Sequence, residues 1–415
     1  MRKSLALQVA LAVSFLAANR AAAQWQQWGG PGRDFKIQSA DLADKWPESG
    51  PKVLWSRDLG DGYACIVSDG KRLYTTYHVE DAEKDVHDDV VVALNPADGT
   101  TVWEYRDPAP FEKGMLHDFG YGPRSTPLIL GDRLYTVGAT AMLTCLDTAT
   151  GKKIWAVDLR KDHGATLLER GYGASPFPYK DKIILPIGGE GHAVVAINQA
   201  DGSLAWKNQS FGPTYASPFI HKVDGEEHLI IFGDKAIHGL DPETGESKWS
   251  HEHAGGANIS TPVAGDDGIF FFSSAYGVGS RAVQVSKADG KYKTEELFFN
   301  KKLKIHHGNA IRIGDYIYAS SGDFGPAFFA AVNVKTGKFG WKKRGITKAN
   351  SVYADDKLII LDEDGRLYLT KVSPKKIDII SKAQLLEKQA WTVPTLVGKT
   401  LYIRDLKKVV AVDLG

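Results

Sequence analysis

The chain has 415 residues, of which 43% are hydrophobic, 10% aromatic and 24% charged, and it contains 43 Gly and 10 Trp. This composition is typical of a soluble domain rich in β-structure, and it excludes a disordered or low-complexity protein. The formal net charge is +1, which gives no reason to expect binding to nucleic acid or to an anionic membrane.

The first 23 residues have the pattern of a secretory signal peptide. Met1-Arg-Lys is a basic start, residues 5–18 are apolar with few interruptions, and Ala21-Ala-Ala precedes Gln24 as a cleavage site. The apolar run is short for a membrane span, and no Cys follows the cleavage site to carry a lipid. We therefore expect cleavage of residues 1–23 and an exported protein, periplasmic or secreted; an uncleaved anchor is the alternative.

Residues 24–50 are predicted to form an irregular N-terminal arm. The stretch begins Trp25-Gln-Gln-Trp28-Gly-Gly-Pro and approaches its end at Trp46-Pro47. Its glycines and prolines are incompatible with a long helix. We expect the arm to lie over the folded domain and to be held there by its tryptophans.

One repeated unit organises residues 51–415. Residues 145–155 show it in the form Cys145-Leu-Asp147-Thr-Ala-Thr-Gly151-Lys-Lys-Ile-Trp155. The Asp or Asn side chain can bond the backbone two residues on and Gly accepts positive φ, so each copy predicts a hairpin with Trp on its second strand. The tryptophans that occupy this position are Trp55, Trp103, Trp155, Trp206, Trp249 and Trp341.

The spacing of the unit predicts the fold. Consecutive copies between Trp55 and Trp249 are about 43 to 52 residues apart, which is the length of a four-stranded propeller blade. A degenerate copy at residues 285–290 puts Thr294 where a Trp is expected, and another begins at Asp364. The chain ends before its last Trp strand, whereas residues 53–58 have such a strand without the preceding turn. We therefore predict an all-β protein, an eight-bladed β-propeller of four-stranded antiparallel blades over residues 51–415, closed by the N-terminal strand.

Eight short segments align as the starts of the innermost strands, from Tyr63-Ala-Cys-Ile66 to Trp391-Thr-Val-Pro394. Their second position is small in every blade, as expected where eight strands crowd around one axis. The residues at this position are Ala64, Ser125, Ala174, Ala216, Ser260, Gly308, Ala349 and Thr392.

Large polar and aromatic residues return at the first position of these segments and just before it. They are Tyr63, Arg124, Tyr172, Tyr215, Asn258, His306, His307, Lys348 and Trp391. We predict that they form a ring around the channel mouth, as a candidate site for a ligand or a partner. The alternative is a solvated funnel wall packed by its own aromatic side chains.

The connections expected at the same end of the channel are long. They cover residues 77–90, 106–123 and 158–172, and long loops often carry function. The first is acidic and contains histidines, but its spacing matches no defined metal pattern and favours a solvated loop. His306 and His307 are likewise excluded as a metal pair, because adjacent residues on a strand point to opposite faces. We predict no metal site and no catalytic residues, and we expect Cys65 and Cys145 to be small buried side chains, with a disulfide as the alternative.

Residues 145–155 resemble the tryptophan-docking repeat of quinoprotein alcohol dehydrogenases, Ala-x-Asp-x-x-Thr-Gly-Lys-x-x-Trp, with Cys145 in place of Ala. The opening of the arm resembles bacterial exported proteins with PQQ-like propeller repeats, including BamB-like propellers. The resemblance implies the fold and implies that the repeat tryptophans dock blade to blade. It does not extend to the vicinal disulfide and calcium ligands of the dehydrogenases, for which no matching motif is present.

These observations favour a non-catalytic binding or scaffold protein of the cell envelope that docks a ligand or partner at the channel mouth and needs no cofactor. The alternative is an alcohol or aldehyde dehydrogenase dependent on pyrroloquinoline quinone (PQQ) and calcium. We expect an envelope protein or a small molecule as partner, no nucleic acid, no transmembrane segment after cleavage, and a monomer.

Overall fold

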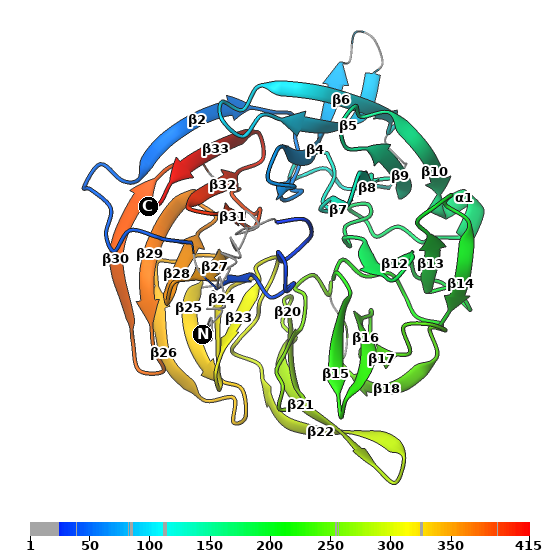
Figure 1. The fold of residues 1–415 in the computed structure, drawn as a ribbon. Helices are drawn as coiled ribbons and strands as arrows, with labels where there is room; N and C mark the ends of the chain where they lie inside the picture. Colours follow the sequence, from blue (N-terminus) through cyan, green and yellow to red (C-terminus); the bar gives the residue numbers. More distant parts are fainter. Residues whose placement is uncertain are drawn as a thin grey trace, which may run out of the picture.

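The computed structural model describes residues 25–415 except residues 39, 82, 84–85, 111–113, 254, 256, 324–326 and 388. Its strands form eight separate sheets arranged as blades around a central axis (Figure 1). The predicted eight-bladed propeller is therefore confirmed. The predicted signal peptide, residues 1–23, lies outside the described residues. Within the described part of the chain, no helix is both long and apolar enough to cross a membrane.

Blades 1 to 4 each contain four antiparallel strands, ordered from the innermost strand outward. Blade 1 contains β3 (Val67–Ser68), β4 (Leu73–Asp81), β5 (Val86–Leu94) and β6 (Thr101–Pro108). Blade 2 contains β7 (Leu128–Leu130), β8 (Arg133–Val137), β9 (Met142–Asp147) and β10 (Lys153–Asp158), followed by the short helix α1 (Leu159–His163). Blade 3 contains β11 (Phe177–Tyr179), β12 (Lys182–Pro186), β13 (Val194–Asn198) and β14 (Leu204–Asn208). Blade 4 contains β15 (Phe219–Val223), β16 (Glu226–Phe232), β17 (Ala236–Leu240) and β18 (Ser247–Glu252).

Blades 5 to 8 repeat this order with two additions from the N-terminal region. Blade 5 contains β19 (Val263–Ala264), β20 (Ile269–Ser274), β21 (Gly279–Ala288) and β22 (Lys291–Asn300). Blade 6 contains β23 (Ala310–Ile313), β24 (Tyr316–Ser321), β25 (Phe328–Asn333) and β26 (Phe339–Arg344). Blade 7 contains β27 (Asn350–Ala354), β28 (Lys357–Leu361), β29 (Arg366–Val372) and β30 (Ile377–Gln384), with β1 (Lys36–Ile37) parallel to β27. Blade 8 contains β31 (Thr395–Val397), β32 (Thr400–Arg404), β33 (Lys408–Asp413) and β2 (Lys52–Asp58).

The ring is closed by the two ends of the propeller sequence, as predicted. Strand β2 pairs antiparallel with β33, so that Trp55 lies opposite Ala411 and Asp58 opposite Lys408 (Figure 1). The last blade thus takes its outermost strand from the N-terminal region, so that β33 is paired on both sides, with β32 and with β2.

The outermost strand of every blade contains a β-bulge just before the Trp position. In blade 8, Val53 pairs with Val412 and Trp55 pairs with Ala411, which leaves Leu54 as the extra residue. The bulge bends the strand locally, and the ring of Trp55 lies against Gly99 in the turn of blade 1. A Cβ atom on Gly99 would be 2.6 Å from that ring. Gly in the repeat therefore supplies both positive φ and room for the neighbouring tryptophan.

Hydrogen bonds join several of these tryptophans to the next blade. The Nε1 atoms of Trp55, Trp103 and Trp155 donate to the carbonyl oxygens of Pro96, Thr148 and Gln199 at 2.9, 3.0 and 3.1 Å. The Nε1 of Trp341 donates likewise to the carbonyl of Ser373 at 2.8 Å. Trp206 packs against Gly245, but its Nε1 has no partner among the described residues.

Two blades have a residue other than Trp at the docking position. Phe298, rather than the predicted Thr294, follows the bulge in blade 5, and a Cβ on Gly337 would be 2.6 Å from its ring. The assignment of Thr294 was wrong because the β21–β22 hairpin is longer than its counterparts. In blade 7, Ser381 follows the bulge, where other blades have Trp. Its Oγ accepts a hydrogen bond of 2.9 Å from the backbone N–H of Trp46, a buried residue of the N-terminal arm.

The N-terminal arm crosses the central axis instead of lying only on the outside (Figure 1). The backbone N–H groups of Ser68 and Ile129 donate to the carbonyl oxygens of Trp25 and Gln26 at 2.8 Å each. The Nε1 of Trp28 donates to the Oγ1 of Thr261 at 2.9 Å. These contacts reach the inner ends of blades 1, 2 and 5, so the arm obstructs the channel.

Six of the eight aligned segments lie just before the innermost strands; the last residue of 307–310 belongs to β23, and the last two residues of 348–351 belong to β27. Residues 63–66, for example, precede β3, which begins at Val67. Residues at the third position of these segments form hydrogen bonds between neighbouring blades. The backbone N–H of Cys65 donates to the Oγ1 of Thr126, and the backbone N–H of Thr126 donates to the Oγ of Ser175. The backbone N–H of Ser175 donates in turn to the Oγ of Ser217. These segments therefore bond sideways around the axis, which strand periodicity alone did not indicate.

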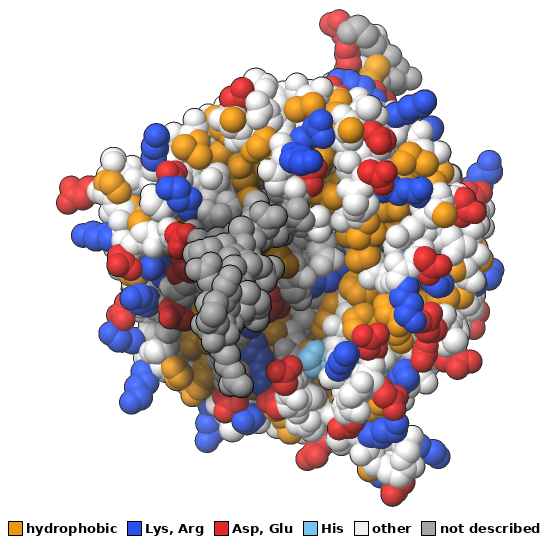
Figure 2. Space-filling view, in the orientation of Figure 1, with side chains coloured by type: hydrophobic (Ala, Val, Ile, Leu, Met, Phe, Trp, Pro, Cys, Tyr) orange, Lys and Arg blue, Asp and Glu red, His pale blue; other side chains and the backbone are white. Residues whose placement is uncertain are grey.

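Two of the predicted loops contain regular structure. Residues 77–90 belong largely to the hairpin of β4 and β5, and α1 occupies part of residues 158–172. Figure 2 shows one face of the ring, where charged side chains of both signs are scattered around the rim without a large patch of one sign. This distribution agrees with the small net charge.

Candidate binding site at the channel mouth

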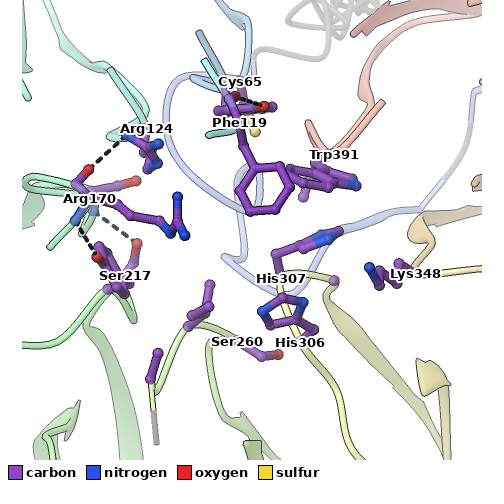
Figure 3. Close-up of a pocket in the computed structure, with 18 of the residues that line it drawn as sticks. Cys65, Phe119, Arg124, Arg170, Ser217, Ser260, His306, His307, Lys348 and Trp391 are labelled. Carbon is purple, nitrogen blue, oxygen red and sulfur yellow. Dashed lines mark hydrogen bonds between the residues drawn. The ribbon is translucent and has the colours of Figure 1, made fainter. Parts of the chain in front are cut away.

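A cavity of about 500 Å³ lies at one end of the channel and contains most of the predicted ring (Figure 3). The ring residues that line it are Tyr63, Arg124, Tyr215, His306, His307, Lys348 and Trp391. Small residues from the aligned segments, including Gly173, Ser260 and Gly308, also line it, and Trp28 contributes to the lining from the N-terminal arm.

Two predicted ring residues do not line this cavity. Tyr172 is 5% exposed and packs into an apolar cluster between blades 2 and 3. Asn258 is 2% exposed, and its Nδ2 donates to the carbonyl of Gly233 while its Oδ1 accepts from the Oγ of Ser274. The Asn258 side chain is thus held by hydrogen bonds within the blades, whereas Tyr172 is held by apolar packing and its buried hydroxyl has no hydrogen-bond partner among the described residues.

Aromatic side chains form one wall of the cavity. The rings of Tyr63 and Trp391 are stacked at 5.4 Å, and His307 lies 4.4 Å from Trp391. Phe119 meets Trp391 edge-on at 5.2 Å and is itself 40% exposed (Figure 3). Trp391 is therefore packed between other rings, whereas Phe119 presents free apolar surface to an incoming group.

Three cations stand over this wall. The guanidinium carbon of Arg124 is 5.7 Å from the Tyr63 ring, that of Arg170 is 4.9 Å from the Phe119 ring, and the Lys348 Nζ is 6.0 Å from the Trp391 ring. Cation–π contacts of this kind favour charge placed beside aromatic faces. The cavity therefore combines apolar surface with positive charge.

The cations differ in their partners. Arg170 contacts Asp118 at 3.2 Å and Glu169 at 3.8 Å, and Lys348 lies 3.6 Å from Glu363. Arg124 has no carboxylate within ion-pair distance among the described residues; its Nη1 donates instead to the carbonyl oxygens of Gly122 and Arg170.

His306 and His307 both face this cavity, with their rings 4.9 Å apart. The expectation that they point to opposite faces was wrong, because they precede β23 and are not on a strand. Burial, together with the charge of Lys348, lowers the pKa of His306 to about 4, and burial lowers the pKa of His307 well below its ordinary value. Both imidazoles are therefore neutral at pH 7.

Aligning the eight repeated segments did not identify several residues that line the cavity. Phe119 and Arg170 come from the connections 106–123 and 158–172, and Tyr276 comes from the turn between β20 and β21. The length of the first two connections was the available signal. Which of their side chains turn inward depends on tertiary contacts, such as the bond from the Tyr63 hydroxyl to the carbonyl of Phe119.

The described residues contain no group of three His, Cys, Asp or Glu side chains placed to hold a metal ion. In the acidic hairpin, His78 and Asp89 are bonded to each other at 3.0 Å. Cys65 and Cys145 are buried free thiols, and burial raises the pKa of each to about 11. Cys65 and Cys145 therefore do not form the vicinal disulfide of the dehydrogenases that the repeat resembles.

The sequence is similar to known propellers over most of its length. A sequence profile described as outer membrane protein assembly factor BamB matches residues 87–171 and 162–377. The protein of that name from Alteromonas naphthalenivorans is 25% identical in an alignment of 260 residues that covers 51% of this chain and 61% of the relative. The match thus spans less than two thirds of that relative.

Solved structures share the fold. BamB from Moraxella catarrhalis gives a TM-score of 0.58 at 18% identity, over 87% of this chain and 99% of that one. Quinohemoprotein alcohol dehydrogenase from Comamonas testosteroni gives 0.65 at 13% identity, over 96% and 82%. At such low identities the likeness establishes the fold and nothing about activity.

Proposed function

Because this chain belongs to the family of the outer membrane protein assembly factor BamB, we propose that it is an exported, non-catalytic scaffold of the cell envelope. The proposed docking position for its partner or ligand is the cavity at the channel mouth. The observation that carries this proposal is that cavity of about 500 Å³, where apolar rings and cations from several blades converge. Converging groups of both kinds in one recess are typical of binding sites.

Export is supported by the pattern of residues 1–23, which is that of a signal peptide. The class of partner is supported by the names of the relatives, which are assembly factors for outer membrane proteins. We therefore propose a periplasmic location and a protein partner that takes part in outer membrane protein assembly.

The exposed aromatic residues at the cavity support docking there. Phe119 is 40% exposed and Tyr276 is 43% exposed, although both belong to the lining. Large exposed rings at the edge of a recess are a common feature of protein interfaces. Burying them against a partner would add hydrophobic stabilisation that the isolated chain lacks.

We also propose that the protein functions without PQQ or calcium. This is supported by the missing metal-ligand cluster in the described residues and by two separate, buried thiols. The tryptophans of the repeat are used for packing between blades, so their presence does not imply a quinone site.

Photo-crosslinking in cells tests the docking position. A photoreactive phenylalanine analogue at Phe119 should capture a partner of the outer membrane assembly machinery. The same analogue at Ile154, which is 45% exposed on the outermost strand β10, is the control and should capture much less. Equal capture from both positions, or unchanged levels of outer membrane proteins in cells that lack this protein, would refute the proposal.

A further inference from the structure

The positive charge at the cavity is distributed unevenly between its interior and its rim. Arg124 is half-buried and has no carboxylate partner among the described residues. The two carboxylates beside Arg170 belong to Asp118 and Glu169, whose side chains are 65% and 64% exposed. Water therefore screens these carboxylates strongly, and they leave the interior positive.

Arg170 has a donor that its carboxylate partners do not use. Its Nη2 contacts Asp118 and its Nε lies nearest Glu169, while its buried Nη1 has no hydrogen-bond partner among the described residues. A bond of 2.7 Å from the Nη1 of Arg124 to the carbonyl of Arg170 holds the two residues together (Figure 3). Guanidinium donors of Arg124 and Arg170 that form no ion pair thus lie close to each other.

The two tyrosines beside Arg124 do not supply the missing negative charge either. Burial raises the pKa of the Tyr63 and Tyr215 hydroxyls, so both stay neutral at pH 7. An arginine in a protein does not lose its proton, and a buried cation without a counter-ion is unfavourable. The geometry is therefore that of a site prepared for an anion.

We propose that the cavity binds a carboxylate carried next to an aromatic or aliphatic group. The carboxylate oxygens accept bonds from Arg124 and Arg170, and the apolar group packs against Phe119. A guanidinium offers two parallel donors that match a carboxylate. The inference rests on the proposed function and deepens it by giving the chemistry of the docked group.

A single negative charge fits better than a phosphate dianion. Of the three cations at this cavity, only Arg124 lacks a counter-ion among the described residues, so the site offers one uncompensated positive charge. The exposed ring of Phe119 further favours an anion that carries apolar surface. Inorganic phosphate is therefore a suitable negative probe.

The same chemistry has two possible sources. One is a free small carboxylate that carries an aromatic ring, and the other is an acidic residue next to an aromatic residue in a partner segment. Calorimetry on the mature protein separates them with two matched pairs: 3-phenylpropanoate against 3-phenylpropanamide, and acetyl-Phe-Asp-amide against acetyl-Phe-Asn-amide. In each pair that binds, the acid should bind about tenfold more tightly than its neutral counterpart. Stronger binding of the peptide assigns the source to a partner, and stronger binding of phenylpropanoate to a small molecule; both support the proposal.

Variants locate the binding. Arg124→Gln should weaken binding of the better acid about tenfold or more. Arg344→Gln, on the exposed outer strand β26, should leave it unchanged. Arg170→Gln is a second test if Arg124→Gln lowers the thermal midpoint strongly, and it should weaken binding in the same direction.

Three results would overturn the inference: neutral probes that bind as well as acids, phosphate that binds as tightly as the carboxylates, or arginine variants with unchanged affinity. Its failure differs from failure of the proposed function. A partner captured at Phe119 without any preference for acids would remove only this inference. Acid binding without a captured partner would remove only the scaffold role.

Discussion

The indole Nε1 of Trp249 donates a 3.0 Å hydrogen bond to the Nδ1 of His228, so this repeat tryptophan is bonded within its own blade. Nδ1 therefore carries no proton, and the neutral imidazole has its proton on Nε2. Protonation of His228 would put hydrogen on both nitrogens and remove the acceptor. Burial correspondingly lowers the pKa of His228 to about 4.

This bond predicts a loss of stability in acid. His238, His253 and His306 are also held near a pKa of about 4, chiefly by burial. Between pH 6.5 and 4 the unfolded chain binds more protons than the folded one, so stability falls as pH falls, by about 1.4 kcal/mol per pH unit for each such histidine. Urea unfolding at several pH values between 7 and 4.5 measures the slope. His228→Gln, which retains an acceptor without titrating, should reduce it; an unchanged slope contradicts this prediction.

A matched pair of glycines tests how the blades dock. Gly151 and Gly290 have φ of 72° and 75°, so alanine strains the backbone equally at both. A Cβ on Gly151 would be 2.4 Å from the Trp103 ring, whereas nothing lies within 4 Å at Gly290. Gly290→Ala should cost about 1 kcal/mol of stability, and Gly151→Ala about 2 kcal/mol more. Equal losses in chemical denaturation would show that the tryptophan contact does not restrict this position.

Arg404 is predicted to stabilise ring closure between blades 8 and 1. Its guanidinium is completely buried and donates to the carbonyl oxygens of Thr76 and Gly60 at 2.7 and 3.1 Å. Arg404→Met would leave these acceptors without their donor and should reduce the free energy of unfolding by about 2 to 4 kcal/mol. The exposed Arg344→Met serves as the control and should change it by less than about 0.5 kcal/mol. Similar unfolding midpoints for the two variants would argue against a role in closure.

No quinone-dependent turnover is expected from the purified protein. With PQQ and calcium added, reduction of an electron-accepting dye by alcohols or aldehydes should stay at the level of the protein-free control. The reason is that neither a metal-ligand cluster in the described residues nor adjacent cysteines are present. Calcium-dependent dye reduction above that level would favour the dehydrogenase alternative.

The blade count was predictable because the Asn or Asp turn with its Gly, and the tryptophan that follows it, as at Trp155, are local sequence signals. They recur at a nearly regular interval along the chain. The pairing of β2 with β33 was predictable because the C-terminal repeat lacked a Trp strand, whereas the N-terminal region contained a Trp strand without the preceding turn. Phe298 was missed since a longer hairpin shifts the docking position without leaving a mark in the turn.

The cavity was only partly predictable for a related reason. Alignment placed Tyr63 and Arg124 correctly at the mouth, because the aligned segments repeat in every blade. Asn258 was misplaced, since its side-chain bonds are made to neighbouring strands rather than toward the axis. Phe119 and Arg170 lie in connections that have no counterpart in other blades, so no repeat could indicate their orientation.

The pairing of β2 with β33 also determines the order in which the molecule can be completed. A ribosome produces Trp55 early, but the partner strand around Ala411 is made only after blades 1 to 7. Until then β2 has no place in a sheet, and the final blade remains without its outer strand. Contacts between such distant parts of a sequence form slowly. A chain interrupted just before β33 would therefore contain almost every blade and still leave β2 and β32 with unpaired strand edges.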